Sequence, residues 1–168
     1  MEKSKPKYVL QEAIGSTLED LDLNRDGQMS GTQIGRLKYK RNRWLLLNAL
    51  LTVVIVLAVR DLSSTERDDV GRSILLMLLA GLPFAWSLLW WVQYTLDLWR
   101  GAVEVVEGGI QLDVVNQGKG GIGYKVCCQE RCFDVAKPVF LAFKNYEPYL
   151  IFYAPYSKTI LSAEWLRE

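Results

Sequence analysis

The stretch ILLMLLAGLPFAWSLLWWVQYTL, Ile74 to Leu96, decides the fold, because none of its side chains is charged. At about 1.5 Å per residue, a helix over this stretch is roughly 34 Å long. The hydrocarbon core of a bilayer is about 30 Å thick, so the stretch predicts a tilted membrane-spanning helix. A soluble fold of 168 residues could not easily cover so much apolar surface.

A second uncharged stretch, WLLLNALLTVVIVLAV, runs from Trp44 to Val59. It is short for a span, but Arg43 and Arg60 can extend their charged ends toward the headgroups, and Trp44 suits the interface. The alternative is a pair of core helices in a soluble α-protein. We expect two spans, at about 43–62 and 73–97. The predicted domains are therefore an N-terminal segment 1–43, a transmembrane hairpin 44–98 and a C-terminal region 99–168.

The distribution of basic residues predicts the orientation of the hairpin. Residues 1–43 hold nine Lys and Arg, and five of them lie beside the first span: Arg36, Lys38, Lys40, Arg41 and Arg43. The loop between the spans, 61–73, holds only Arg67 and Arg72. Both termini are therefore expected in the cytoplasm, with the protein multi-pass in the membrane. The basic cluster matches anionic lipid headgroups, and the net charge of +1 indicates no nucleic-acid partner.

The C-terminal region has the pattern of short β-strands. AVEVVE (102–107), Gly108-Gly109 and IQLDVV (110–115) predict a hairpin with a tight turn at the glycines. Further strand-length runs are YKVCC, CFDV, YLIFYA and TILSAEW, with one short helical turn expected in KPVFLAFKNYEPY. The predicted fold is an α+β membrane protein: an N-terminal helix-turn-helix, a two-helix transmembrane hairpin and a C-terminal small antiparallel β-sheet or barrel of five or six strands.

Two segments of this region carry a family resemblance. The ending YLIFYAPYSKTILSAEWL, together with GAVEVVEGGI after the second span, resembles an uncharacterised group of bacterial membrane proteins. Members of that group pair two spanning helices with a compact β domain that closes on Tyr-Ala-Pro, Ser-Lys and Leu-Ser-x-Glu. The resemblance implies this fold and a location in the bacterial inner membrane, and it brings no activity with it. The three cysteines and the Gly-rich loop depart from the group.

The stretch DLNRDGQMSGTQ, Asp22 to Gln33, is similar to a calcium-binding EF-hand loop. Such a loop would use oxygens of Asp22, Asn24, Asp26, Gln28 and Gln33. The last position normally holds a bidentate Glu, and a neutral Gln there predicts weak binding of Ca²⁺ at most.

The same residues have a second interpretation. Ser30 and Gln33 fit a capping box, in which each side chain accepts a hydrogen bond from the other residue's backbone N–H. The stretch would then be the turn of a helix-turn-helix without metal. The two interpretations predict nearly the same backbone.

The cysteines and glycines are candidates for chemistry of other kinds. Cys127, Cys128 and Cys132 offer three thiols for a soft metal or a redox response, but neighbours on a strand point to opposite faces. A closed zinc site lacks a fourth ligand, and a cytoplasmic location argues against a structural disulfide. GKGGIG (118–123) imitates a phosphate-binding loop, but a strand is predicted after it where such a loop needs a helix, so no nucleotide is expected.

The second predicted span carries an aromatic face. Trp86, Trp90 and Tyr94 follow one another at intervals of four residues, so they stack along one side of a helix. They would pack against the first span, against a partner's helix, or against a flat hydrophobic cofactor. Asn48 and Gln93 lie near the same membrane face and are expected to form an interhelical hydrogen bond worth about 1 kcal/mol.

The function that follows is non-enzymatic. The chain has no His, which removes the commonest catalytic base. We expect an accessory or assembly subunit that docks through its hairpin and contacts a membrane-protein partner or a second copy of itself with its cytoplasmic β domain. The alternatives are a calcium-responsive membrane sensor and a thiol or metal site in the β domain. Membrane lipid is expected around the hairpin, and no cofactor is expected beyond weakly bound Ca²⁺.

Overall fold

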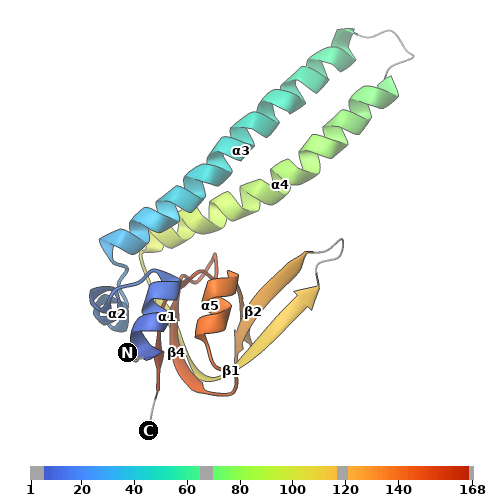
Figure 1. Cartoon of the computed structure of the whole chain (residues 1–168). Coiled ribbons are helices and arrows are strands. Elements are labelled where there is room, and N and C mark those ends of the chain that lie inside the picture. Colours follow the sequence, from blue (N-terminus) through green and yellow to red (C-terminus); the bar gives the residue numbers. More distant parts are fainter. Residues whose placement is uncertain (1–5, 65–69, 117–120, 167–168) are drawn as a thin grey trace. The chain divides into compact units, whose positions relative to one another are not determined.

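A computed structural model describes residues 6–64, 70–116 and 121–166 (Figure 1). The chain divides into two compact units, Met1–Ile34 with Arg100–Glu168, and Gly35–Trp99. We call the first unit the β domain and the second the helical hairpin. The N-terminal segment therefore belongs to the same unit as the C-terminal sheet. The predicted division at residues 43 and 98 differs from this, because contacts with the last strand, which no local pattern records, hold the N-terminal helices.

The β domain contains one open antiparallel sheet. Its strands are β1 (Glu104–Asn116), β2 (Ile122–Cys128), β3 (Arg131–Val135), β4 (Pro148–Tyr153) and β5 (Ile160–Trp165). They lie in the order β3-β2-β1-β4-β5, with every neighbouring pair antiparallel. The five-stranded antiparallel sheet was predicted. Among the described residues β3 and β5 are its edges, so the barrel alternative is not formed.

The predicted turn at Gly108-Gly109 is wrong, because β1 continues through both glycines. Its first half pairs with β4, from Glu104 opposite Tyr153 to Gly109 opposite Pro148. Its second half pairs with β2, beginning at Ile110 opposite Cys128. Gly108 has a φ of +157°, and a Cβ there would lie 3.3 Å from the side chain of Gln129. The glycines thus let one long strand change partners, a use of Gly at a bend in a sheet.

The core of the β domain lies on one face of the sheet. It contains residues from all five strands together with Leu10 of α1 (Pro6–Ile14) and Phe143, which follows α5 (Lys137–Ala142). The fully buried side chains there include Val126, Phe133, Ile151 and Ala163. In Figure 1, α1 and α5 lie against the sheet, which matches their contribution to this core.

The N-terminal helices are placed by caps. α2 (Leu18–Arg25) begins with a capping box in which Thr17 Oγ1 accepts from the N–H of Asp20 and Asp20 accepts from the N–H of Thr17. A second reciprocal pair stands before α3 (Gly31–Ser64): Ser30 Oγ accepts from the N–H of Gln33, and Gln33 Oε1 accepts from the N–H of Ser30 at 3.1 Å. Both pairs satisfy backbone donors that a helix leaves free.

The helical hairpin consists of most of α3 and of α4 (Val70–Arg100), which run antiparallel (Figure 1). The predicted spans fall within these helices, and α4 continues through Pro83. Among the described residues, one helical stretch, Gly31–Arg60, is long and apolar enough to cross a membrane, and 11% of its most apolar window is buried. One such helix near the N-terminus is weak evidence of membrane association, since signal sequences share this property.

Candidate functional site

The helical hairpin exposes apolar side chains along both helices. On α3, Leu46 is 73% exposed and Leu50 is 62% exposed, and on α4 Leu82 is 73% exposed. The further exposed apolar residues of the two helices are Leu45, Leu47, Val53, Val54, Val56, Leu57, Val59, Ile74, Leu75, Leu78, Leu79, Leu88, Leu89, Val92 and Leu96. Soluble monomers rarely expose continuous apolar surface of this extent, so the hairpin has the surface of a segment that is covered by lipid or by another protein.

An aromatic column joins the two helices. Trp90 of α4 stacks on Trp44 of α3, with ring centroids 6.1 Å apart and planes 11° apart. On α4 itself, Trp90 also contacts Trp86 at 6.5 Å and Tyr94 at 6.3 Å. The structure therefore packs the predicted aromatic face against the first helix at Trp90, whereas Trp86 remains 63% exposed. Sequence reasoning assigned Trp44 to the membrane interface and missed it as the partner of Trp90.

Asn48 pairs with a different residue from the one predicted. Its Oδ1 accepts a hydrogen bond from Ser87 Oγ, and both side chains are buried between the helices. The predicted partner, Gln93, lies six residues further along α4, which is about 9 Å in a helix. The contact between Trp44 and Trp90 sets this register, because it places Asn48 level with Ser87. Among the described residues, Asn48 Nδ2 has no hydrogen-bond partner.

A cavity of about 420 Å³ lies in the hairpin, and two residues of this column, Trp44 and Tyr94, form part of its wall. Its lining consists of Lys40, Arg43, Trp44 and Leu47 from α3 and Tyr94 from α4. The α3 residues recur at intervals of three and four, so they share one face of the helix. The lining is thus cationic toward the start of α3 and apolar further along it. No carboxylate is among the lining residues that the structure describes.

Of the two interpretations of Asp22–Gln33, the predicted capping box of Ser30 and Gln33 is formed, and the arrangement of a calcium loop is not. Asp22 and Asn24 belong to α2, whose capping box starts a helix that continues as far as Arg25. Asp22 is exposed and pairs with Arg25 at 2.9 Å, while Asn24 is buried and donates from Nδ2 to Ser162 Oγ at 2.6 Å. Two side chains that should converge on a cation therefore point to different surroundings.

The other three predicted calcium ligands have roles of their own. Asp26 is the C-cap of α2, and Gln28 forms an isolated antiparallel bridge with Ala102. Gln33 is fully buried, where its Oε1 caps α3 and its Nε2 donates to the carbonyl of Leu161 at 3.3 Å. Among the described residues, no group of three acidic, Cys or His side chains is arranged to hold a metal ion.

Buried amide side chains instead attach the N-terminal segment to β5. Gln11 Nε2 donates to the carbonyl of Ala163 at 2.8 Å, and Asn24 and Gln33 reach Ser162 and Leu161. Three consecutive residues of β5 thus each receive one amide from a different part of the N-terminal segment. The sequence signal for α2 was present as Thr-Leu-Glu-Asp, Thr17 to Asp20, in which Asp stands where a capping box usually has Glu or Gln.

The carboxyl group of Asp20 supports the same region. Burial raises the pKa of Asp20, but hydrogen bonds from Ser30, Thr17 and Thr32 outweigh this and hold the pKa below its ordinary value. Thr32 Oγ1 donates to Asp20 Oδ1 at 2.8 Å, which links the starts of α2 and α3. The charged form of this carboxyl is therefore the one that stabilises the fold.

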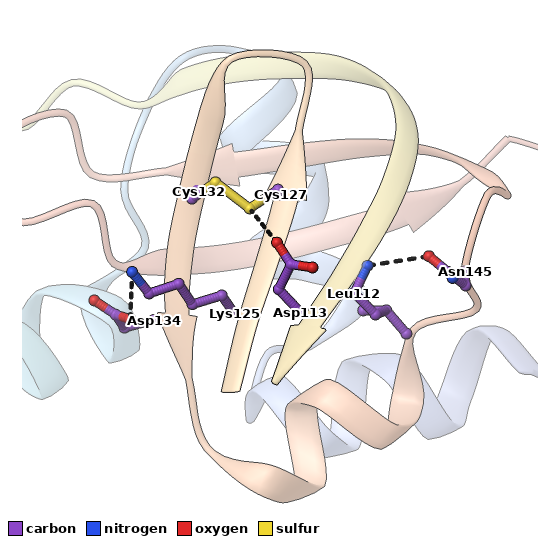
Figure 2. The surroundings of a disulfide bond; sticks show 7 residues. All are labelled: Leu112, Asp113, Lys125, Cys127, Cys132, Asp134 and Asn145. Atoms are coloured by element: carbon purple, nitrogen blue, oxygen red, sulfur yellow. Dashed lines mark hydrogen bonds and ion pairs between the residues drawn. A yellow bond between two sulfur atoms is a disulfide. The ribbon is translucent and has the colours of Figure 1, made fainter. Parts of the chain in front are cut away.

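Cys127 and Cys132 form a disulfide, with Cα atoms 4.0 Å apart (Figure 2). They face each other across the β2–β3 ladder, and Cys127 Sγ lies 4.0 Å from Asp113 Oδ2. A cytoplasmic location argued against a structural disulfide, whereas in this structure the pairing of β2 with β3 places the two cysteines directly opposite each other and their sulfurs are joined. Cys128 faces the core and is fully buried, as strand alternation predicted. Burial, with a smaller contribution from Glu107, raises the pKa of the Cys128 thiol.

The three cysteines therefore do not form one site. Two are joined on the outer face of the sheet, and the third is closed within the core. The Gly-rich loop gives no second candidate: residues 117–120 lie outside the described part of the chain, and β2 begins at Ile122. A strand therefore follows the loop, where a phosphate-binding loop requires a helix N-terminus.

Beyond the core, the sheet ends in an apolar tip. Val114 of β1 and Ile122 of β2 are each 61% exposed. By strand alternation they lie on the same face as Ile110 and Val126, whose side chains are in the core. We call Val114 and Ile122 the β1–β2 tip. It continues the core face where no described residue covers it.

Comparison with known proteins found no match: no protein-family model, no curated protein and no solved structure is significantly similar to the chain.

Proposed function

We propose that the chain is a non-enzymatic accessory or assembly subunit of the bacterial inner membrane, which docks through its helical hairpin and contacts a membrane-protein partner with its β domain. The observation that carries this proposal is the exposure of apolar side chains along both helices of the hairpin. Water would make that exposure costly, at about 25 cal/mol for each Å² of apolar surface. Lipid removes the cost without any further protein.

The lengths of the helices support a spanning topology. A helix needs about 20 residues to cross the hydrocarbon core, and α3 and α4 have 34 and 31 residues. Both helices leave the β domain at neighbouring points, because the N–H of Val103 donates to the carbonyl of Gly27 at 3.1 Å and Gln28 bridges Ala102. A hairpin that returns to its starting point has both ends on one side of a membrane. The excess of Lys and Arg before the first predicted span favours the cytoplasm for that side.

The β1–β2 tip supports the second half of the proposal. Val114 and Ile122 present exposed apolar side chains on one face at the end of the β1–β2 ladder, and contact with a partner would remove this apolar surface from water. The opposite face of β1 supplies a matched control, since Val105 is 54% exposed there.

The test begins with membrane fractionation and a topology assay on the full chain. We expect extraction by detergent but not by alkaline carbonate, and reporter fusions at both termini should read as cytoplasmic. A chain released by carbonate would exclude membrane insertion.

Partner contact is tested by purification in mild detergent, followed by sizing of what co-migrates. The wild-type chain is expected in a stoichiometric complex, and Val114→Asp with Ile122→Asp should weaken that complex about tenfold or more. Val105→Asp should leave it intact. A wild-type monomer with nothing bound would count against a subunit role.

A further inference from the structure

We propose that the cavity lined by Lys40, Arg43, Trp44, Leu47 and Tyr94 is a binding site for an anionic phospholipid, with the lipid phosphate between Lys40 and Arg43. The inference rests on the proposed insertion of the hairpin in a membrane. It goes further by assigning a single lipid site with a defined charge requirement, at a place where insertion alone would require only general contact with lipid.

The first argument is the unmet charge of the cavity. Lys40 and Arg43 both line it, and neither has an ion-pair or hydrogen-bond partner among the described residues. In the described part of the chain, no acidic side chain lines the cavity. Two cations three residues apart lie on neighbouring positions of one helix face, where they repel each other. A phosphate between them would relieve the repulsion and accept charge-assisted hydrogen bonds from both.

The second argument is the order of the lining along α3. Lys40 comes first, Arg43 and Trp44 are adjacent about one turn later, and Leu47 lies about two turns after Lys40. A site for a free inorganic anion needs no apolar end, whereas a phospholipid has a phosphate joined to acyl chains. The order of charge and apolar surface in the cavity therefore matches a lipid that lies with its headgroup at Lys40 and Arg43 and its chain beside Leu47.

The third argument is the rigidity of the cavity wall. Trp44 stacks on Trp90, which in turn stacks on Tyr94, so two lining residues are held by one aromatic column that crosses both helices. Tyr94 is 7% exposed. A wall that is already ordered loses little conformational entropy when a ligand binds. The cavity also falls within the range of about 300–1,000 Å³ that is usual for small-ligand sites.

The test uses the full chain, purified in detergent and stripped of lipid, with lipid adducts counted by native mass spectrometry. The probes are phosphatidylglycerol and phosphatidylcholine with identical acyl chains. We expect phosphatidylglycerol to bind at one site in preference to phosphatidylcholine. The variant Lys40→Gln with Arg43→Gln should weaken that binding about 30-fold, on the basis of the usual contribution of each basic residue near anionic lipid.

The matched control is Lys38→Gln with Arg41→Gln, which removes the same charge from the same helix but from residues that do not line the cavity. It should change binding less than about threefold. Equal weakening by both variants would overturn the proposal, because it would show diffuse attraction to the basic helix. Displacement of the lipid by millimolar inorganic phosphate would also overturn it, in favour of a free-anion site.

A charge-conserving variant, Lys40→Arg with Arg43→Lys, guards against loss of folding. Retention of phosphatidylglycerol by this variant is expected, and its loss would show that the site does not work by charge. Membrane fractionation separates this result from the proposed function: a chain that inserts in the membrane but shows no preference for phosphatidylglycerol disproves the lipid site alone.

Discussion

Asn24 and Ser162 are 138 residues apart in the chain and joined in the structure, since Asn24 Nδ2 donates to Ser162 Oγ at 2.6 Å in a buried setting. This contact ties α2 to β5. Asn24 occupies the position of the second ligand in the calcium-loop interpretation. In the structure its side chain instead joins the N-terminal and C-terminal parts of the β domain.

Replacement of Asn24 by Ala should destabilise the β domain. The change removes a buried hydrogen bond and leaves Ser162 without this donor, which typically costs about 1–3 kcal/mol. Chemical denaturation of the full chain, followed by the fluorescence of the β domain, measures the loss. Asp22→Ala is the control: its pair with Arg25 is exposed, so a change below about 1 kcal/mol is expected. Equal losses in the two variants would contradict the role given to Asn24.

Calcium should have no effect on the N-terminal helices. Asn24 and Gln33 already form hydrogen bonds within the fold, and Asp22 faces solvent. Isothermal titration of the full chain with millimolar Ca²⁺ is therefore expected to show no binding that Asp22→Ala or Asp26→Ala removes. A saturable binding heat in the wild-type chain that is absent from both variants would support the sensor hypothesis. It would mean that α2 unwinds when Ca²⁺ binds.

The Asp20 carboxyl should make the β domain sensitive to acid. Because the folded pKa lies below the ordinary value of 3.8, the stabilisation is present above that value and is lost as pH falls through the folded pKa. Asp20→Asn should remove this part of the acid dependence and cost about 1 kcal/mol near neutral pH through the cap. Denaturation midpoints measured from pH 2 to pH 7 compare the two proteins. If the denaturation midpoints of the two proteins changed in parallel with pH, Asp20 would not contribute to the acid sensitivity.

The cysteines give an independent measure of orientation. A cytoplasmic β domain would keep Cys127 and Cys132 reduced in the cell, because cytosolic thiol systems reduce such bonds. Thiols trapped by rapid alkylation before lysis should then be labelled at both positions, and purification in air should close the disulfide. Cys128 should label only after unfolding, since it is fully buried. An intact disulfide in the trapped sample would place the β domain on the oxidising side of the membrane.

Asn48 and Ser87 should be coupled energetically. In a double-mutant cycle with Asn48→Ala and Ser87→Ala, an interaction of about 1 kcal/mol is expected for a hydrogen bond between helices in a membrane. The same cycle with Gln93→Ala in place of Ser87→Ala should give no coupling. Hairpin stability in detergent is the quantity measured. Coupling to Gln93 alone would mean that the helices pack in the register first expected.

The periodicity of the sequence predicted which side chains share one face of a helix. It did not predict which residues of two helices contact each other. The aromatic face of Trp86, Trp90 and Tyr94 follows from helical spacing alone, but its contact with Trp44 depends on how far one helix slides along the other. The same slide decides the partner of Asn48. A helix of 3.6 residues per turn has many acceptable registers against a neighbour, and side-chain packing chooses between them.

The sheet shows the same limit. Strand-forming residues predicted the approximate positions of the strands, but Gly108-Gly109 was interpreted as a turn. The two glycines have the composition of a tight turn, and only pairing with β4, about forty residues later, keeps the chain extended there. The buried amides of Gln11, Asn24 and Gln33 are likewise invisible to local patterns, because their partners lie in β5.

The bridge between Gln28 and Ala102 makes the β domain a discontinuous one, with the helical hairpin inserted in it. Synthesis runs from the N-terminus, so α1 and α2 leave the ribosome long before β5, on which their buried amides depend. The apolar helices emerge in between. The helical hairpin is therefore synthesised while the domain that surrounds it in sequence is still incomplete, and the buried amides of α1 and α2 gain their β5 partners only after α3 and α4 have been made.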